Sequence, residues 1–245
     1  MSSFYANPTD LPKGLDISRL KVILFDVNET LLDLSEVEQA FGRAFEQPFA
    51  FRHWFSQLLH YSLVDTITEN FHDFRQIGEA AMAMTSQFFD KAVSPEQRQQ
   101  LLNTFGQLPP HPDCKEGLKR LKAGGFRLAA LTNSPAQTLH KQMAQSGLDV
   151  FFDAMLSVEA TQRYKPHPAP YQLALAHLEV QPNEALMVTA HGWDIAGASH
   201  AGLYTAFLAR KGQALYPLTA APALTGSTLV DLAGQLEAKQ RGEAG

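Results

Sequence analysis

The sequence predicts an α/β fold, a doubly wound parallel sheet, with a helical insert after its first strand. Short continuous apolar runs recur along the chain, as expected for strands covered on both faces of a parallel sheet. Helical stretches separate these runs from about residue 113 to 210. The segment from about 34 to 110 has helical periodicity and no strand signal of comparable strength. It therefore interrupts the alternation as an insert.

The apolar runs all have strand length. They are "LKVILF" (20–25), "FRLAALT" (126–132), "AMLSV" (154–158), "ALMVTA" (185–190) and "YTAFLA" (204–209). Between them lie helical stretches, and glycine, a usual C-terminal stop, closes three of these. The stretches are "CKEGLKRLKAG" (114–124), "SPAQTLHKQMAQSG" (134–147), "HPAPYQLALAHL" (167–178) and "DIAGASHAG" (194–202). "TAAPALTGS" (219–227) is expected to be a loop before a short strand and a C-terminal helix, "DLAGQLEAKQ" (231–240).

The insert carries an apolar stripe in "FRHWFSQLLHYS". Its members fall at i, i+3, i+4, i+7 and i+8 of a helix, namely Phe51, Trp54, Phe55, Leu58 and Leu59. Most of them are expected to form the core of the insert, which ends near "LPPHPD" (108–113). The predicted organisation is a core domain over 18–33 and 111–240 and a helical domain over 34–110.

Composition excludes several classes of protein. With 245 residues, 45% hydrophobic and 18% charged, the chain fits an ordinary globular protein. A net charge of −5 without a basic run argues against a nucleic-acid partner. The single cysteine, Cys114, forms no internal disulfide, and no apolar run has transmembrane length. "MSSFYANPTDLPKG" lacks the regions of a secretory signal, so we expect a cytoplasmic protein without a membrane partner.

Polar clusters follow several of the predicted strands. Ligand sites of open α/β sheets lie beyond the carboxyl ends of the strands, where these clusters are expected to meet. The clusters are Asp26, Asn28 and Thr30; Thr132, Asn133 and Ser134; and Thr189, His191 and Asp194, with Lys165 in the loop "RYKPHPAPY". An aspartate at a strand end is more often a cap than a nucleophile, but the coincidence of the clusters favours a catalytic site.

Four segments together resemble the motifs of the haloacid dehalogenase superfamily, in order. They are "FDVNETLLD", "LAALTNS", "YKPHPAPY" and "MVTAHGWDIAGASHAG", and the resemblance spans roughly residues 20 to 212. It is strongest to the type II 2-haloacid dehalogenase branch. The resemblance implies a Rossmann-like core, an α-helical cap over the site, an aspartate nucleophile at Asp26 and a homodimer.

Asn28 bears on the reaction. Phosphatases of the superfamily use a second aspartate, two residues after the nucleophile, to protonate the leaving alkoxide, and an amide delivers no proton. They also hold Mg²⁺ with acids of the fourth motif, where this chain keeps Asp194 but has Ala190 four residues earlier. A halide leaves without a proton or a metal. We therefore expect no metal and no cofactor.

The resemblance assigns further roles. Lys165 would keep Asp26 ionised, and Thr30 would orient it. Thr132 and Asn133 would bind the substrate carboxylate, with helix capping as the alternative role. Tyr171 matches a site tyrosine, and packing is its alternative. Three residues would surround Lys165 and the hydrolytic water, namely Thr189, His191 and Asp194.

Two departures from the branch stand out. His191 takes the place of an asparagine and could serve as a base. Phe55 stands where the branch has an arginine that helps to hold the leaving halide, a kind of stabilisation often worth about 2.7 to 4 kcal/mol. Arg52, one helical turn earlier, is a candidate to reach the same space. Trp193 is expected to be a packing residue.

The predicted function is that of a metal-independent hydrolase with a covalent aspartyl ester. Its expected substrate is a small organic acid, a 2-haloacid that is converted to a 2-hydroxy acid. One alternative is a phosphatase of the same superfamily acting on a small phosphate ester. Another is a degenerate, non-catalytic member that binds a metabolite or a protein partner.

Overall fold

Six parallel strands form one sheet in the order β3-β2-β1-β4-β5-β6 in the computed structural model, which describes residues 14–242. The strands are β1 (Val22–Phe25), β2 (Arg127–Thr132), β3 (Ala154–Ser157), β4 (Ala185–Thr189), β5 (Tyr204–Leu208) and β6 (Leu224–Gly226). Five of them coincide with the apolar runs of the sequence. The predicted α/β class with a Rossmann-like parallel sheet is confirmed.

β1 lies at the centre of the sheet, between β2 and β4. Val22 pairs with Arg127 of β2 on one side and with Ala185 of β4 on the other. The chain moves outward from β1 through β2 to β3, then crosses back to β4 on the opposite side of β1. Such a reversal of strand order opens a crevice beyond the carboxyl ends of the two strands that flank it.

Helices cover both faces of the sheet. Val22 and Leu24 of β1 pack into one apolar cluster with residues of α7 and α8, while Ile23 and Phe25 face a second cluster that includes residues of α5, α6 and α9. This alternation follows from the two-residue period of a strand. The helices are α5 (Cys114–Ala123), α6 (Ala136–Ser146), α7 (Pro168–His177), α8 (Gly192–His200) and α9 (Leu229–Gln240).

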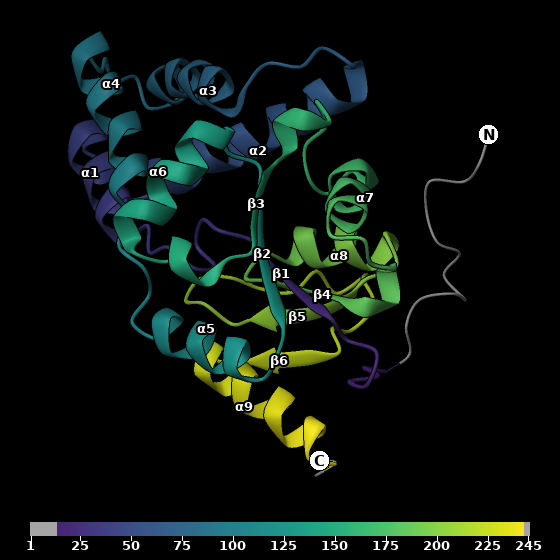
Figure 1. The fold of residues 1–245 in the computed structure, drawn as a ribbon. Coiled ribbons are helices and arrows are strands. Elements are labelled where there is room, and N and C mark those ends of the chain that lie inside the picture. Colours follow the sequence, from purple (N-terminus) through teal and green to yellow (C-terminus); the bar gives the residue numbers. More distant parts are fainter. Residues whose placement is uncertain (1–13, 243–245) are drawn as a thin grey trace.

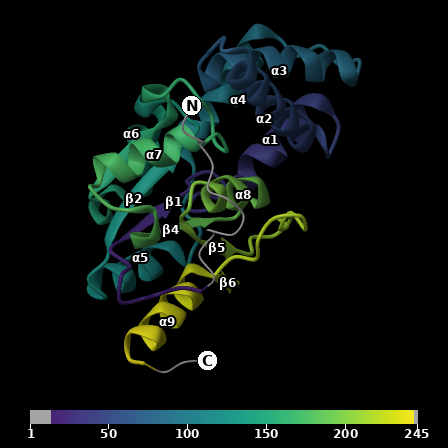
Figure 2. The ribbon, with the colours of Figure 1, turned by 90° about the vertical axis from the view of Figure 1, so that its right-hand side faces the viewer.

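The segment between β1 and α5 is helical, as predicted. Its helices gather at one end of the molecule, and α9 lies at the opposite end (Figures 1 and 2). They are α1 (Ser35–Phe45), α2 (Ala50–Thr68), α3 (Phe74–Phe88) and α4 (Pro95–Thr104). Of the stripe on α2, Phe51, Trp54, Phe55 and Leu58 are buried and Leu59 is partly buried. The division into a core and a cap domain remains a proposal.

Some boundaries differ from those expected. β6 lies inside the segment 219–227 that was expected to be a loop, and α9 begins at Leu229, directly after it. α8 begins at Gly192 rather than Asp194. The segment expected to lack a secretory signal lies, except for Gly14, outside the described residues. Between residues 14 and 242, no helix combines the length and the hydropathy needed to cross a membrane.

Candidate active site

Asp26 directly follows β1, at the reversal of strand order. Its backbone N–H still donates to the carbonyl of Val188 in β4, so the sheet fixes the position of the residue. The loops after β1, β2 and β4 and the loop before α7 converge there. The structure thus brings Asp26 together with Thr30, Lys165, Asp194 and others of the predicted site residues.

Asp26 is buried, with 4% of the residue exposed, and its carboxylate accepts hydrogen bonds from three side chains. Lys165 Nζ lies 3.0 Å from Oδ1. Thr30 Oγ1 lies 2.7 Å and His191 Nδ1 3.0 Å from Oδ2. Burial alone would raise the pKa of Asp26, but the Lys165 ammonium and the His191 and Thr30 hydrogen bonds hold that pKa well below its usual range. The carboxylate is therefore ionised at neutral pH.

Lys165 lies between two carboxylates. Its Nζ is also 2.8 Å from Oδ2 of Asp194, and both side chains are fully buried. Burial would lower the pKa of Lys165, but Asp194 and Asp26 raise it above its usual value. The Tyr171 hydroxyl donates to Asp194 Oδ1 at 2.5 Å, and burial together with Asp194 raises the pKa of Tyr171 well above its usual value. Tyr171 and Asp194 therefore hold the ammonium against Asp26.

His191 links Asp26 to a carboxylate that the sequence analysis did not identify, that of Glu29. The other ring nitrogen, Nε2, lies 3.0 Å from Oε2 of Glu29, which is 7% exposed. Burial disfavours a charged imidazole, but the hydrogen bonds and charges of Asp26 and Glu29 raise the pKa of His191 to about 9. In the free enzyme His191 is therefore an imidazolium that donates to both acids. A role as a base requires that one of these acids first lose its charge.

Glu29 in turn binds Arg52 on α2, with Oε1 2.7 Å from Nη1. Arg52 also lies 3.5 Å from Glu38 and over the ring of Phe51. The expectation that Arg52 takes the place of the missing arginine is not supported, because Glu29 and Glu38 draw its guanidinium toward themselves. Phe55 is buried on the same helix, with its ring centroid 6.4 Å from that of His191.

Asn28 connects the β1 loop to the loop after β2. Its amide nitrogen donates to Ser134 Oγ at 3.1 Å, and its oxygen accepts from Gln142 of α6 at 3.1 Å. Ser134 and Gln142 are buried; Ser134 belongs to the polar cluster predicted after the second strand, whereas Gln142 was not predicted, and neither had been given a role. Their signal in the sequence was weak, because serine and glutamine beside a helix start are ordinary capping and packing residues.

Thr132, Asn133 and Thr189 all make hydrogen bonds that shape the loops. Thr132 Oγ1 accepts from the N–H of Ser134, and Thr189 Oγ1 accepts from the N–H of His191. Asn133 Oδ1 accepts from the N–H of Lys165 at 2.9 Å, and its Nδ2 donates to the Lys165 carbonyl at 3.4 Å. These hydrogen bonds therefore fix the backbone that presents Lys165 and His191.

Trp193 covers the site. Its ring stacks on that of His191 at 5.1 Å between centroids, and Lys165 Nζ lies 5.7 Å from its centroid. Trp193 is a packing residue, as predicted. It packs against His191 and Lys165 and helps to shield these two cations from solvent.

The donor set does not suit a divalent cation of the phosphatase type. Each oxygen of Asp26 and of Asp194 already faces a cation or a hydroxyl, and Ala190 occupies the position of the further acid. No group of three or more acids, histidines or cysteines within residues 14–242 is arranged to hold a metal ion. The ammonium of Lys165 takes the space between the two acids.

Two pockets are lined by residues of the loop after β1, one by Asn28 and the other by Glu29. A cavity of about 70 Å³ lies between the helical insert and the core, lined by Asn28, Trp54, Leu58, Phe74, Arg75, Gly78, Leu102, Phe105, Ser134, Pro135 and Thr138. A larger cleft of about 770 Å³ opens beside Glu29 and Arg52.

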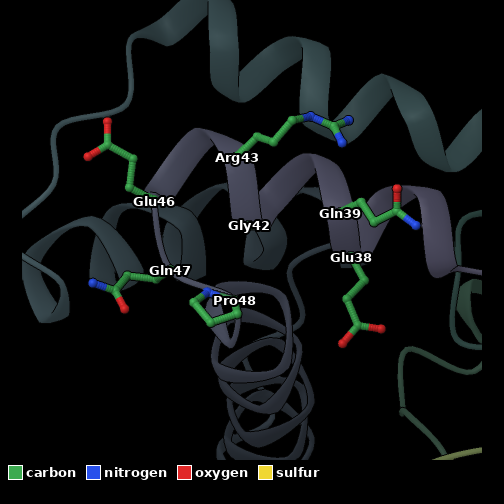
Figure 3. A pocket seen from close by; sticks show the side chains of 7 residues that line it. All are labelled: Glu38, Gln39, Gly42, Arg43, Glu46, Gln47 and Pro48. Carbon is green, nitrogen blue, oxygen red and sulfur yellow. The ribbon is translucent and has the colours of Figure 1, made fainter.

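A third pocket, of about 420 Å³, is lined by residues of α1 and of the turn after it. The side chains that line it point away from one another and form no convergent cluster (Figure 3). It is therefore not a candidate for the catalytic site.

Comparisons with known proteins identify the family of this chain. The haloacid dehalogenase-like hydrolase family matches residues 20–202. The (S)-2-haloacid dehalogenase 4A of Burkholderia cepacia is 30% identical over 201 residues, which cover 80% of this chain and 86% of that protein. The haloacetate dehalogenase H-2 of Moraxella sp. is 25% identical and covers 85% of this chain and 94% of its own length. The L-2-haloacid dehalogenase of Xanthobacter autotrophicus, solved with chloropropionic acid covalently bound, has a TM-score of 0.82 at 26% identity over 89% of this chain and 98% of its own.

Proposed function

This chain belongs to the haloacid dehalogenase-like hydrolase family, and on that premise we propose that it hydrolyses a small 2-haloacid to a 2-hydroxy acid without a metal. The observation that carries the proposal is the state of Asp26. It is a buried, ionised carboxylate held by Lys165, and its site has neither a general acid at Asn28 nor a divalent-cation set. Such a carboxylate suits the displacement of a leaving group that departs as a stable anion.

In the first step, an oxygen of Asp26 attacks C2 of the substrate. The new carbon–oxygen bond forms as the carbon–halogen bond breaks, and the halide leaves with the electron pair. Lys165 and Thr30 orient the nucleophile and keep it ionised. The covalently bound chloropropionic acid in the similar Xanthobacter enzyme supports an intermediate of this kind.

In the second step, water attacks the carbonyl carbon of the aspartyl ester. The bond between this carbon and the substrate oxygen breaks, which releases the 2-hydroxy acid and restores the Asp26 carboxylate. Over both steps, a haloacid and water give a hydroxy acid, a halide ion and a proton. Asp194 remains paired with Lys165 throughout and holds the ammonium beside the reacting carboxylate.

The pocket between insert and core is the proposed substrate site. Its polar lining consists of Asn28, Arg75, Ser134 and Thr138. Trp54, Leu58 and Phe105 are part of its apolar lining. At about 70 Å³ the cavity accepts an acid of only a few carbon atoms. We propose that Thr132, Asn133 and the amides beside them bind the substrate carboxylate, after the loop contacts of these side chains rearrange.

The absence of an arginine at Phe55 shapes the expected substrate range. Lys165 and His191 contact Asp26 on the side of the nucleophile, whereas in-line displacement sends the halide to the opposite side of C2, and α2 offers no cation at Phe55 for the stabilisation of the departing halide. We expect faster turnover of bromo- and iodoacids than of chloroacids, because the weaker carbon–halogen bond demands less of that stabilisation. The predicted homodimer is a separate proposal that light scattering tests.

The test is parallel measurement of halide and phosphate release from panels of 2-haloacids and phosphate esters, with EDTA and with Mg²⁺. Wild type is compared with Asp26→Asn and with a control, Asp90→Asn, at an exposed turn residue whose φ of 48° suits asparagine equally. Halide release that survives EDTA and Asp90→Asn but not Asp26→Asn is the expected result. Mg²⁺-dependent phosphate release would instead establish the phosphatase alternative. Silence on both panels would favour the non-catalytic alternative.

A further inference from the structure

A line of alternating charges runs from the nucleophile toward the surface. Asp26 binds His191 Nδ1, His191 Nε2 binds Glu29, and Glu29 binds Arg52, with contact distances of 3.0, 3.0 and 2.7 Å. Asp26, His191 and Glu29 are each less than a tenth exposed, whereas the side chain of Arg52 is 38% exposed. The imidazole is thus the bridge between a buried acid at the reaction centre and an acid closer to solvent.

Glu29 lies where this line of charges reaches a surface cleft. The cleft of about 770 Å³ is lined by Glu29 and Arg52 together with loops from several parts of the chain. The basic side chains His111, Arg210 and Lys211 also line this cleft, as do the acids Asp33 and Glu38. One carboxylate oxygen of Glu29 therefore holds His191, and the other is held by Arg52 at the edge of the cleft.

The proposed reaction needs such a path. Each turnover releases a proton inside a closed site, and the other acid there offers no exit, since Asp194 is fully buried and bound by Lys165 and Tyr171. His191 and Glu29 are the hydrogen-bonded groups that lead from Asp26 to the cleft.

The backbone of Glu29 adds a second observation. Its φ is 61°, in the left-handed region that glycine adopts without strain, and it does not cap a helix. A side chain in this conformation costs about 1 kcal/mol. The carboxylate at this position is therefore retained against a local conformational preference, in keeping with a role for its contacts to His191 and Arg52.

We propose that His191 and Glu29 form a proton-transfer dyad that serves the hydrolysis of the aspartyl ester. His191 is the catalytic base for the attacking water, Glu29 is the positioning residue that fixes its tautomer, and the cleft beside Arg52 is the exit for the released proton. The inference rests on the proposed function, because it assigns the second step of that reaction.

The protons balance as follows. When Asp26 becomes an ester, the imidazolium loses one of its two anionic partners and gives its Nε2 proton through Glu29 to the cleft. The remaining ring proton then moves from Nδ1 to Nε2 by way of a water molecule, so that Nε2 donates to Glu29 and Nδ1 faces the ester without a proton. Neutral His191 then takes a proton from water as the water oxygen bonds to the ester carbonyl carbon. It returns this proton to the departing alkoxide, which leaves as the hydroxy acid. Asp26 then remains as a protonated carboxylic acid. It transfers its proton to His191, which restores the free enzyme.

Electrostatics support this sequence. In the free enzyme the two acids outweigh burial and raise the pKa of His191 to about 9, so the ring begins as a cation. The groups that face it from the surrounding elements are Asp26 and Glu29 on the β1 loop, Arg52 on α2, Lys165 before α7 and Asp194 on α8. Esterification removes the charge of Asp26 and leaves the cations in place, which lowers the proton affinity of the ring.

The kinetic test uses His191→Asn and Glu29→Gln, with Glu38→Gln as the matched control. Glu38 also contacts Arg52 at the cleft but makes no contact with His191 in the described structure. In His191→Asn and Glu29→Gln we expect a burst of about one halide per site, followed by steady turnover roughly 100-fold slower or more, whereas Glu38→Gln should turn over like wild type. Intact-mass measurement should then find the substrate-derived ester on Asp26 in these two variants only. The rate of ester hydrolysis should depend on pH in wild type, and we expect this dependence to be lost in Glu29→Gln.

A second measurement is independent of any substrate. The ¹⁵N chemical shifts of the His191 ring, followed against pH, should report an imidazolium at neutral pH in wild type. In Asp26→Asn, which carries a neutral side chain like the ester, the pKa of the ring should fall by about one unit or more.

The outcomes separate the two proposals. Turnover and ester level that match wild type in both dyad variants overturn the dyad, as does a lost halide burst, which would place these residues in the first step. If wild type releases no halide, the proposed function fails. The ring titration tests the electrostatic premise of the dyad separately: a fall of the ring pKa in Asp26→Asn supports that premise, and an unchanged titration overturns the dyad even where halide is released.

Discussion

The Lys165 ammonium lies 3.0 Å from the carboxylate of Asp26, and the two side chains are 0% and 6% exposed. Replacement by methionine would leave the carboxylates of Asp26 and Asp194 buried without their cation. The expected result is a loss of about 3 to 5 kcal/mol in the free energy of unfolding, together with loss of turnover at neutral pH. Urea denaturation followed by circular dichroism measures the first quantity.

Lys122→Met is the control for this substitution. Lys122 also pairs with an aspartate, Asp153, but both side chains are more than a third exposed. An exposed pair contributes about 0 to 1 kcal/mol. Equal losses in the two variants would contradict the idea that burial gives the Lys165 pair its importance.

His191 makes stability depend on pH in the alkaline range. Its pKa of about 9 in the folded state lies above the ordinary value of 6.5, so its contribution is fully present below pH 6.5 and is lost as the pH rises through 9. The difference between the two values corresponds to about 3 kcal/mol. Unfolding free energies of wild type and His191→Asn, measured from pH 6 to 10, should converge by an amount of this order. A constant gap between the two curves would count against the assignment.

Phe55 and His191 should couple energetically. Phe55→Arg would place a buried guanidinium near the His191 imidazolium, while Glu29 and Glu38 are already paired with Arg52, and we expect it to destabilise the fold by roughly 2 to 4 kcal/mol. In a chain that also carries His191→Asn, the repulsion is gone and Glu29 is free to bind the new arginine. A double-mutant cycle by urea unfolding should give a coupling of about 1 kcal/mol or more in favour of the pair. Additive effects would show that the two positions do not share one electrostatic environment.

The sheet and most of the cluster were accessible from the sequence because their signals are local. Continuous apolar runs such as "LKVILF" predicted buried strands, and the polar residues directly after them had to meet at one edge. β6 was not located because its three residues, Leu224–Gly226, are too few for a pattern. It forms because β5 offers an edge to pair with.

Glu29 escaped the sequence analysis for a different reason. A glutamate in a turn after a strand is usually solvated, and its partner His191 lies 162 residues away. The position of Arg52 was read correctly as a neighbour of Phe55 on a helix, but helical spacing does not tell which acid binds a guanidinium. A signal did exist, since an acid, Glu29, and a histidine, His191, stand in two motifs that meet at the same nucleophile. The charge of a residue in one motif can be balanced by a residue in another motif, and this pairing is not apparent when each motif is considered alone.

Gly197 lets α8 approach the loop that carries Lys165. A Cβ at this position would lie 2.5 Å from Cβ of Pro166 and 2.6 Å from the hydroxyl of Tyr171, so alanine must displace one of them. We expect Gly197→Ala to cost about 1 to 3 kcal/mol of stability and to lower kcat, because a shift of Tyr171 loosens Asp194 and, through it, Lys165. Gly42→Ala on α1 is the control, as the nearest atom there is 3.7 Å away and alanine favours a helix by about 0.5 to 1 kcal/mol. Unchanged turnover in Gly197→Ala, despite lower stability, would mean that the active site tolerates movement of α8 and that Tyr171 does not control the position of Lys165.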